Sequence, residues 1–201
     1  MGPDNRPARN DPRLASGIPG ASTQAELGQV IRRPRRLSVV GPLRSHRRAS
    51  RALSCRVLNE LLADSMNLYA HYTKYVWLLR NKGLHSLRLL FESSAADQGE
   101  LIDRLVERVQ ALGGVPTLPR QVGDLALVSR PPHELDDVAD MLSRLLRSHQ
   151  QVVGRLNQAI GKIDMSGDHP SQTLLKDMAC RHESQIALLA DYIDDDAEQS
   201  A

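Results

Sequence analysis

Residues 135–163, LDDVADMLSRLLRSHQQVVGRLNQAIGKI, decide the fold class. Apolar residues and one histidine recur here every seven positions, and a second apolar set follows the first four of them three positions later. The first set is Leu135, Leu142, His149, Leu156 and Ile163, and the second is Val138, Leu145, Val152 and Ala159. This spacing places both sets along one seam of a packed helix. Because His149 falls on that seam, we interpret it as a core histidine whose ring nitrogens are hydrogen-bonded.

The same spacing of apolar residues continues outward in both directions. It predicts helices at about 51–80, 84–112 and 170–194, in addition to the one at 133–164. Glycines at 83, 113, 114 and 167 mark the breaks between them. A long connection joins the second and third helices, and a short helix is expected within it between 120 and 128. The sequence therefore predicts an all-α fold over residues 51–197, a ferritin-like four-helix bundle with one long middle crossover.

The formal net charge of +2 is divided unevenly along the chain. Residues 1–50 contain ten arginines, no lysine and three acids, whereas residues 51–201 contain sixteen basic and twenty-one acidic residues. Residues 1–50 also hold six of the eleven prolines, and their apolar residues follow no period. We expect this segment to be a disordered tail, because it cannot bury enough apolar surface to offset the entropy of ordering.

The arginines of this tail are the candidate DNA-binding residues. Guanidinium groups pair with phosphates without reading the base sequence. Other interpretations remain open for the tail: a transit-like leader, which is also rich in arginine and poor in acids, a solvated linker, or an element that binds another polyanion. The candidates are Arg32, Arg33, Arg35, Arg36, Arg44, Arg47 and Arg48.

The composition argues against several classes of protein. Aromatic residues make up 3% of the chain, too few for a β-sandwich or for a protein that stacks bases on aromatic rings. No apolar run is long enough to span a membrane, and the N-terminus lacks the apolar core of a secretory signal. Cys55 and Cys180 are expected to be packed thiols in a reducing cytosol. No phosphate-binding loop, nucleophile elbow or zinc spacing is present.

Three carboxylates share one face of the second predicted helix. Asp103 and Glu107 are one turn apart, and Glu92 lies about three turns earlier. Such a row of acids is either a solvated helix face or a site for a hard cation. The residues alone leave both interpretations open.

Several segments resemble the Dps mini-ferritins, the DNA-binding proteins from starved cells. They are Leu58–Asp64, Tyr72–Trp77, Phe91-Glu92, Glu100–Gly114, Arg130–Pro132 and Met141–Leu146, and the resemblance spans about residues 53–194. It implies a four-helix bundle that assembles into a hollow dodecamer in the bacterial cytoplasm, associated with the nucleoid. It also implies an iron site between two-fold-related subunits. There, Fe(II) is oxidised and stored as ferric iron, which protects DNA during starvation and oxidative stress.

The resemblance implies that Glu92, Asp103 and Glu107 are the acidic iron ligands. Val76 and Arg88, however, stand where the family has its two histidine ligands. Valine has no donor atom, and a guanidinium does not deprotonate to become a ligand.

We hypothesise that Arg88 takes the electrostatic role of the metal. It would pair with Glu92 in its own subunit and with Asp103 and Glu107 across the interface. Alternatively, Arg88 turns to solvent and the acids still bind iron weakly. His85 is a less favoured substitute ligand, and His71 is less favoured still.

Three functions follow as expectations. The first is a cage that binds and shields DNA through its arginine tail and stores some iron, with an impaired ferroxidase site. The second is an active ferroxidase that uses peroxide to oxidise Fe(II). The third is a subunit that co-assembles with an active paralogue and supplies only shell and tail.

Overall fold

The computed structural model describes residues 42–80, 82–117, 121–134 and 136–199, with side chains described from Arg47 to Asp194. This part of the chain forms helices and loops and contains no strand. The helices are α1 (Pro42–Leu79), α2 (His85–Ala111), α3 (Val122–Leu125), α4 (Val138–Ser166) and α5 (His169–Gln199). The predicted all-α, ferritin-like bundle with a short helix in its middle crossover is confirmed.

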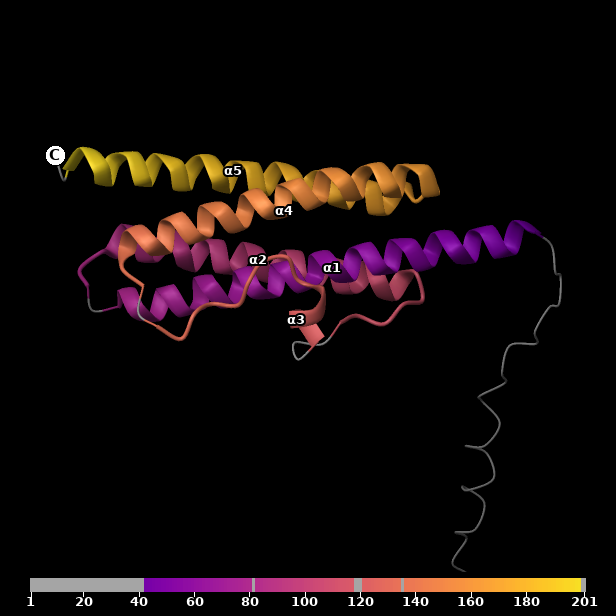
Figure 1. The fold of residues 1–201 in the computed structure, drawn as a ribbon, viewed down its shortest axis with the longest axis horizontal. Coiled ribbons are helices and arrows are strands. Elements are labelled where there is room, and N and C mark those ends of the chain that lie inside the picture. Colours follow the sequence, from indigo (N-terminus) through magenta and orange to yellow (C-terminus); the bar gives the residue numbers. More distant parts are fainter. Residues whose placement is uncertain (1–41, 81, 118–120, 135, 200–201) are drawn as a thin grey trace, which may run out of the picture. The chain divides into compact units, whose positions relative to one another are not determined.

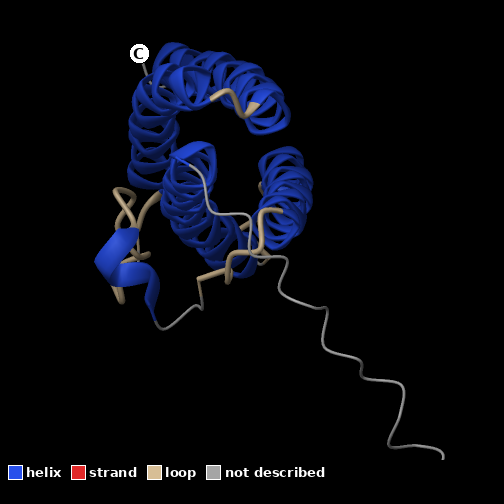
Figure 2. Cartoon of the chain, turned by 90° about the vertical axis from the view of Figure 1, so that its right-hand side faces the viewer, coloured by secondary structure: helices blue, strands red, loops and turns tan. Residues whose placement is uncertain are grey.

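The four long helices form two pairs. Helix α1 packs beside α2, and α4 packs beside α5, while α1 also contacts α4 (Figure 1). The crossover that carries α3 lies against α1 on the outside of the long helices (Figure 2). None of the helices within the described ranges is both long and apolar enough to cross a membrane.

The core contains the apolar faces of all four long helices. The predicted seam of α4 is buried from Leu142 to Ile163, and Val138 at its start is half-buried. Three aromatic rings, those of Tyr72, Tyr75 and Phe91, are fully buried between α1 and α2. Tyr72 meets Phe91 edge to face, with 5.7 Å between ring centroids, a geometry that favours aromatic pairs. The apolar period therefore identified the buried faces correctly.

Helix α1 begins nine residues earlier than predicted, at Pro42 rather than Arg51. Residues 43–50 contain neither glycine nor proline, and proline is well suited to the first helical position. The side chains of Arg47, Arg48 and Ala49 are exposed here, so these turns show no apolar period. The expectation that residues 42–50 belong to a disordered tail is therefore wrong. Residues 1–41 lie outside the described part of the chain.

Helix α4 begins at Val138, later than the predicted residue 133. Asp137 has an extended backbone, and its Oδ1 accepts the N–H of Asp140 at 2.8 Å, so it caps the helix. Before the cap, Lys74 Nζ donates to the carbonyl oxygens of Pro132 and Glu134 at 2.7 and 2.6 Å. These bonds hold residues 132–134 against α1, so α4 starts only after its N-cap, Asp137.

The two glycines predicted to stop α2 act in different ways. Gly113 has a φ of +77°, which L side chains rarely adopt. Gly114 has an ordinary backbone but no free space, because a Cβ atom there would lie 2.6 Å from Cys55 Sγ. Cys55 is half-buried and Cys180 is exposed, and both are free thiols.

His149 is a core histidine with both ring nitrogens hydrogen-bonded, as predicted. Its Nε2 lies 2.7 Å from Tyr72 Oη, and its Nδ1 lies 2.8 Å from Nδ1 of His182. Burial lowers the pKa of His149 well below its usual value and that of His182 to about 4. Both imidazoles are therefore neutral at physiological pH.

This histidine pair should make the fold sensitive to acid. An unfolded histidine titrates at about pH 6.5, so the folded chain binds fewer protons than the unfolded chain as the pH falls toward 4. The contribution of neutral His182 to the free energy of unfolding is therefore fully present above about pH 6.5 and decreases as the pH falls below that value. At pH 4 the decrease amounts to roughly 3 kcal/mol. We expect His182→Gln to flatten this part of a pH series of urea unfolding. His133→Gln, at an exposed histidine, is the control. If His182→Gln and the natural chain lose the same free energy of unfolding between pH 6.5 and pH 4, His182 is not the cause of the acid sensitivity.

Candidate functional site

Arg88 and Glu92 form an ion pair one turn apart on the first half of α2. The side chains are 25% and 39% exposed, respectively, and Arg88 Nη1 donates to Glu92 Oε1. They line a surface pocket of about 510 Å³ at the turn between α1 and α2, together with His85 and Arg80. The predicted pairing of Arg88 with Glu92 within one subunit is therefore present, and Arg88 is not turned away from the acid.

His85 is engaged by the same guanidinium. Its Nδ1 lies 3.1 Å from Arg88 Nη2, and an arginine nitrogen can only donate. The Nδ1 lone pair of His85 therefore accepts a hydrogen bond from Arg88. In this arrangement His85 supports the Arg88–Glu92 pair and does not offer that nitrogen to a metal.

Val76 and His71, the two other residues of α1 considered for the iron site, are buried in the core. Val76 is 8% exposed and packs with the buried residues of α1, whereas its neighbour Trp77 is 62% exposed. His71 is fully buried. Its Nε2 lies 2.9 Å from the carbonyl oxygen of Ser129, and its Nδ1 lies 3.3 Å from Tyr75 Oη. His71 thus holds the crossover against α1, which leaves it no part in a metal site.

The two remaining candidate ligands lie further along α2. Asp103 and Glu107 are exposed, and neither has an ion pair with another described residue. Eleven helical residues place Asp103 about 16 Å along the axis from Glu92, too far to share one ion. Within the described residues, no three His, Cys, Asp or Glu side chains gather closely enough to hold a metal. A site that uses all three carboxylates therefore needs a second copy of the chain.

The candidate DNA-binding arginines fall into two groups. Arg32, Arg33, Arg35 and Arg36 lie outside the described residues. Arg44 belongs to α1, and Arg47 and Arg48 follow it on the same helix with exposed side chains. The structure therefore places the second cluster at the start of a helix.

Several ionic contacts between elements distant in sequence were not predicted. Arg155 on α4 donates to Asp64 on α1 at 2.8 Å, and Arg108 on α2 donates to Asp168 in the α4–α5 turn at 2.5 Å. Arg108 and Arg155 each precede a buried apolar residue, a position where sequence alone does not distinguish a surface charge from a paired one. Only the three-dimensional arrangement brings these partners together.

Comparisons with known proteins agree with this architecture. The family described as ferritin-like domain matches residues 55–198. The structure of DpsC from Streptomyces coelicolor is 37% identical, covers 72% of this chain and 86% of that chain, and gives a TM-score of 0.69. An uncharacterized protein of Kitasatospora aureofaciens is 42% identical over 59% of this chain and 80% of its own length. A protein of Halobacterium salinarum named DNA protection during starvation protein is 27% identical over 74% of this chain and 82% of its own length.

Proposed function

The chain belongs to the Dps branch of the ferritin-like family, and from that premise we propose that it binds and protects DNA while oxidising iron poorly. Its arginine-rich N-terminal residues would bind DNA, and its folded body would form the shell of a cage. The observation that carries the proposal is the Arg88–Glu92 ion pair, which joins a fixed cation to an expected iron ligand.

The iron part of the proposal follows from charge and donor type. The Arg88 guanidinium already neutralises Glu92, so an Fe(II) ion arriving there must displace a paired cation or remain close to it. Val76 contributes no donor atom in place of the second imidazole. Carboxylate oxygens remain, and they bind Fe(II) less well than a mixed set of imidazole and carboxylate ligands. Iron binding at this site is expected to be weak and its oxidation slow.

The DNA part of the proposal is supported by charge and by relatives. Ten arginines and three acids occupy residues 1–50, and Arg47 and Arg48 are exposed at the start of α1. Relatives from Halobacterium and Synechococcus carry names that refer to DNA protection and DNA binding. An acidic body would repel DNA, so these arginines would supply the attraction, and several copies in one cage would act together.

An active ferroxidase is the second candidate function. It is favoured by Asp103 and Glu107, which are exposed and without ion pairs among the described residues. In a two-fold dimer they could face Glu92 of another subunit and retain a cation. For the DNA-binding cage we also propose assembly as a dodecamer in the cytoplasm, in association with the nucleoid. Co-assembly with an active paralogue, to which this chain supplies only shell and tail, is a third candidate.

Replacing four N-terminal arginines by glutamine in the full chain tests the DNA proposal. Each lost phosphate contact lowers the slope of log affinity against log salt by about 0.9. We expect the variant to bind DNA at least tenfold more weakly in a gel shift near physiological salt and to show a shallower salt slope. The four substitutions are Arg32→Gln, Arg33→Gln, Arg35→Gln and Arg36→Gln.

A variant with the same change in charge provides the control. It carries glutamine at four exposed arginines of the folded body and should bind DNA almost as the natural chain does. If the N-terminal variant shifts DNA at the same protein concentration as the natural chain, these arginines are not the DNA element. The control substitutions are Arg56→Gln, Arg80→Gln, Arg130→Gln and Arg147→Gln.

A further inference from the structure

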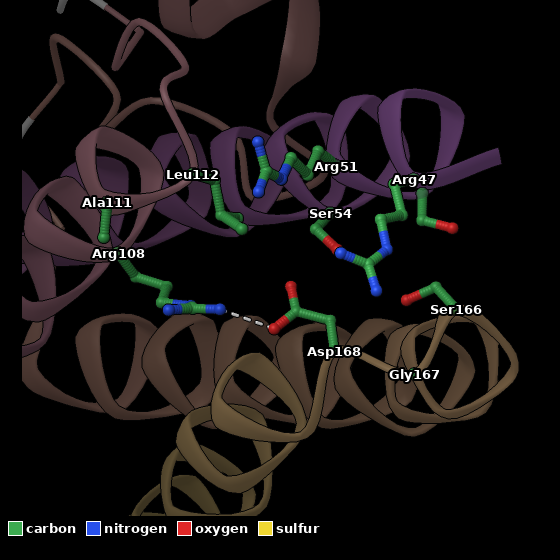
Figure 3. Close-up of a pocket in the computed structure, with 10 residues that line it drawn as sticks. Arg47, Arg51, Ser54, Arg108, Ala111, Leu112, Ser166, Gly167 and Asp168 are labelled. Carbon is green, nitrogen blue, oxygen red and sulfur yellow. Dashed lines mark hydrogen bonds and ion pairs between the residues drawn. The ribbon is translucent and has the colours of Figure 1, made fainter. Parts of the chain in front are cut away.

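A second pocket lies at the end of the α1–α2 pair opposite Arg88. It is an open surface pocket with a volume of about 360 Å³, bordered by the start of α1, the end of α2 and the α4–α5 turn (Figure 3). Three arginines line it, Arg47, Arg51 and Arg108, together with the hydroxyl groups of Ser50, Ser54 and Ser166. This volume lies at the lower end of the roughly 300–1,000 Å³ found for small-ligand pockets. The pocket shares no residue with the iron site.

The one acid that lines the pocket, Asp168, already has its hydrogen-bond partners. Its Oδ1 accepts from Arg108 Nη2 at 2.5 Å, and its Oδ2 accepts from Ser171 Oγ at 2.7 Å. Burial opposes ionisation of Asp168, but hydrogen bonds from Ser171 and Arg108, together with the nearby hydroxyl of Ser54, outweigh it and lower the pKa of Asp168 below its usual value. Arg108 and Asp168 therefore form a neutral pair that holds α2 against the α4–α5 turn.

Arg47 and Arg51 remain as surplus positive charge. They lie one turn apart on α1, and neither has an ion pair with a described residue. Like charges at this spacing repel and destabilise a helix. In Figure 3 the guanidinium of Arg47 reaches into the space between Ser54, Ser166 and Asp168. The guanidinium of Arg51 lies on the other side of Ser54, beside Leu112, so the two arginines line the pocket from different sides. An anion in the pocket would reduce the repulsion between them.

Ser54 adds a hydroxyl group at the floor of the pocket. The residue is fully buried, and its Oγ has no hydrogen bond of normal length and angle among the described residues. It faces Asp168, whose ionised form it favours. Because this hydroxyl lines the pocket, it is available to donate a hydrogen bond to an oxygen atom of a bound ligand. The site therefore offers two guanidinium forks and at least one hydroxyl donor.

We propose that this pocket binds a phosphate group, either as inorganic phosphate or as a phosphate of a DNA backbone. The planar guanidinium fork matches the spacing of two phosphate oxygens, and hydroxyl groups can donate to a third. The surplus charge of the pocket matches the charge of a phosphate. This inference does not depend on DNA binding by Arg32 to Arg36, because the pocket is built from folded residues.

Calorimetric titration of the full-length protein with sodium phosphate tests the proposal, against sodium chloride at matched ionic strength. We expect saturable binding with one site per chain. Arg51→Gln should weaken it about tenfold, because a hydrogen bond to a charged group is lost. Ser54→Ala should weaken it severalfold without changing the charge. Arg56→Gln is the matched control on the same helix, since Arg56 is exposed and does not line the pocket.

The outcomes separate the proposal from general attraction to a basic surface. Absence of saturable binding would overturn it, and so would an equal loss of affinity in Arg51→Gln and Arg56→Gln. Thermal unfolding of each variant shows whether the fold is retained, and Ser54→Ala keeps the test informative if Arg51→Gln unfolds. Competition by a short DNA duplex then identifies the source of the phosphate. If the duplex displaces inorganic phosphate from the pocket, the natural ligand is a backbone phosphate of DNA. If phosphate stays bound in the presence of the duplex, the ligand is the free ion.

Discussion

Replacing Val76 and Arg88 together by histidine is expected to raise the rate of peroxide-driven Fe(II) oxidation by roughly two orders of magnitude. The change adds two imidazole donors and removes the cation that neutralises Glu92. Even residues that only support metal ligands contribute about 10–100-fold to metal affinity or activity, so restoring two ligands should have at least that effect. The rate is measured by the absorbance of ferric iron, at equal concentrations of assembled protein.

Three control variants separate the causes of this gain. Arg88→Gln removes the positive charge without adding a ligand, and it should give only a small part of the increase. Arg80→His places an imidazole in the same pocket, but not at position 76 or 88, and it should leave the rate of Fe(II) oxidation low. Val76→His alone leaves Arg88 paired with Glu92 and should stay slow. A natural chain that already oxidises iron as fast as the double variant would refute the impaired-site proposal.

Replacing Arg155 by methionine is expected to destabilise the fold by about 3–5 kcal/mol, the usual cost of removing one partner from a buried ion pair. Asp64 is fully buried, and its Oδ1 accepts the N–H groups of Leu127 and Val128 at 2.6 and 2.8 Å. Arg155 Nη1 donates to its Oδ2 at 2.8 Å and to the carbonyl oxygen of Leu125 at 3.1 Å. The pair therefore joins α1, α4 and the crossover at one point.

Urea unfolding at a fixed protein concentration measures this loss, because association also contributes to the apparent stability of an oligomer. Arg147→Met is the matched control on α4, since Arg147 is exposed and, among the described residues, donates only to the carbonyl oxygen of Ser143 in its own helix. It should change the free energy of unfolding by less than about 0.5 kcal/mol. The double variant Asp64→Asn with Arg155→Met should lose less free energy of unfolding than the sum of the losses in the two single variants. A loss below about 1 kcal/mol in Arg155→Met would contradict the buried-pair account.

The sequence predicted the helices where apolar residues carried a period and missed them where they did not. The seam from Leu142 to Ile163 identified α4 and its buried face because packing against the core imposes that spacing. The first turns of α1 have exposed arginines and an exposed alanine, so no period marked them as helical. The start of α4 was misplaced because hydrogen bonds from Lys74, which is distant in sequence, hold the residues before it.

The candidate site was predictable to the extent that it lies on one helix. Arg88 and Glu92 are four residues apart, which is enough to predict their ion pair. The engagement of His85 by Arg88 also follows from helical spacing, although it was not predicted. In contrast, the pocket around Arg47 and Arg51 depends on how α1, α2 and the α4–α5 turn meet. The spacing of residues along one helix does not predict how that helix packs against distant elements.

We propose that Arg88 holds the place of a metal ion beside Glu92. Crystals of the assembled protein soaked in Fe(II), with anomalous diffraction recorded at the iron absorption edge, test it most directly. We predict no iron peak at Glu92 and a guanidinium of Arg88 between this acid and Asp103 and Glu107 of a second copy. An iron peak bound by these carboxylates, with Arg88 displaced toward solvent, would contradict the account.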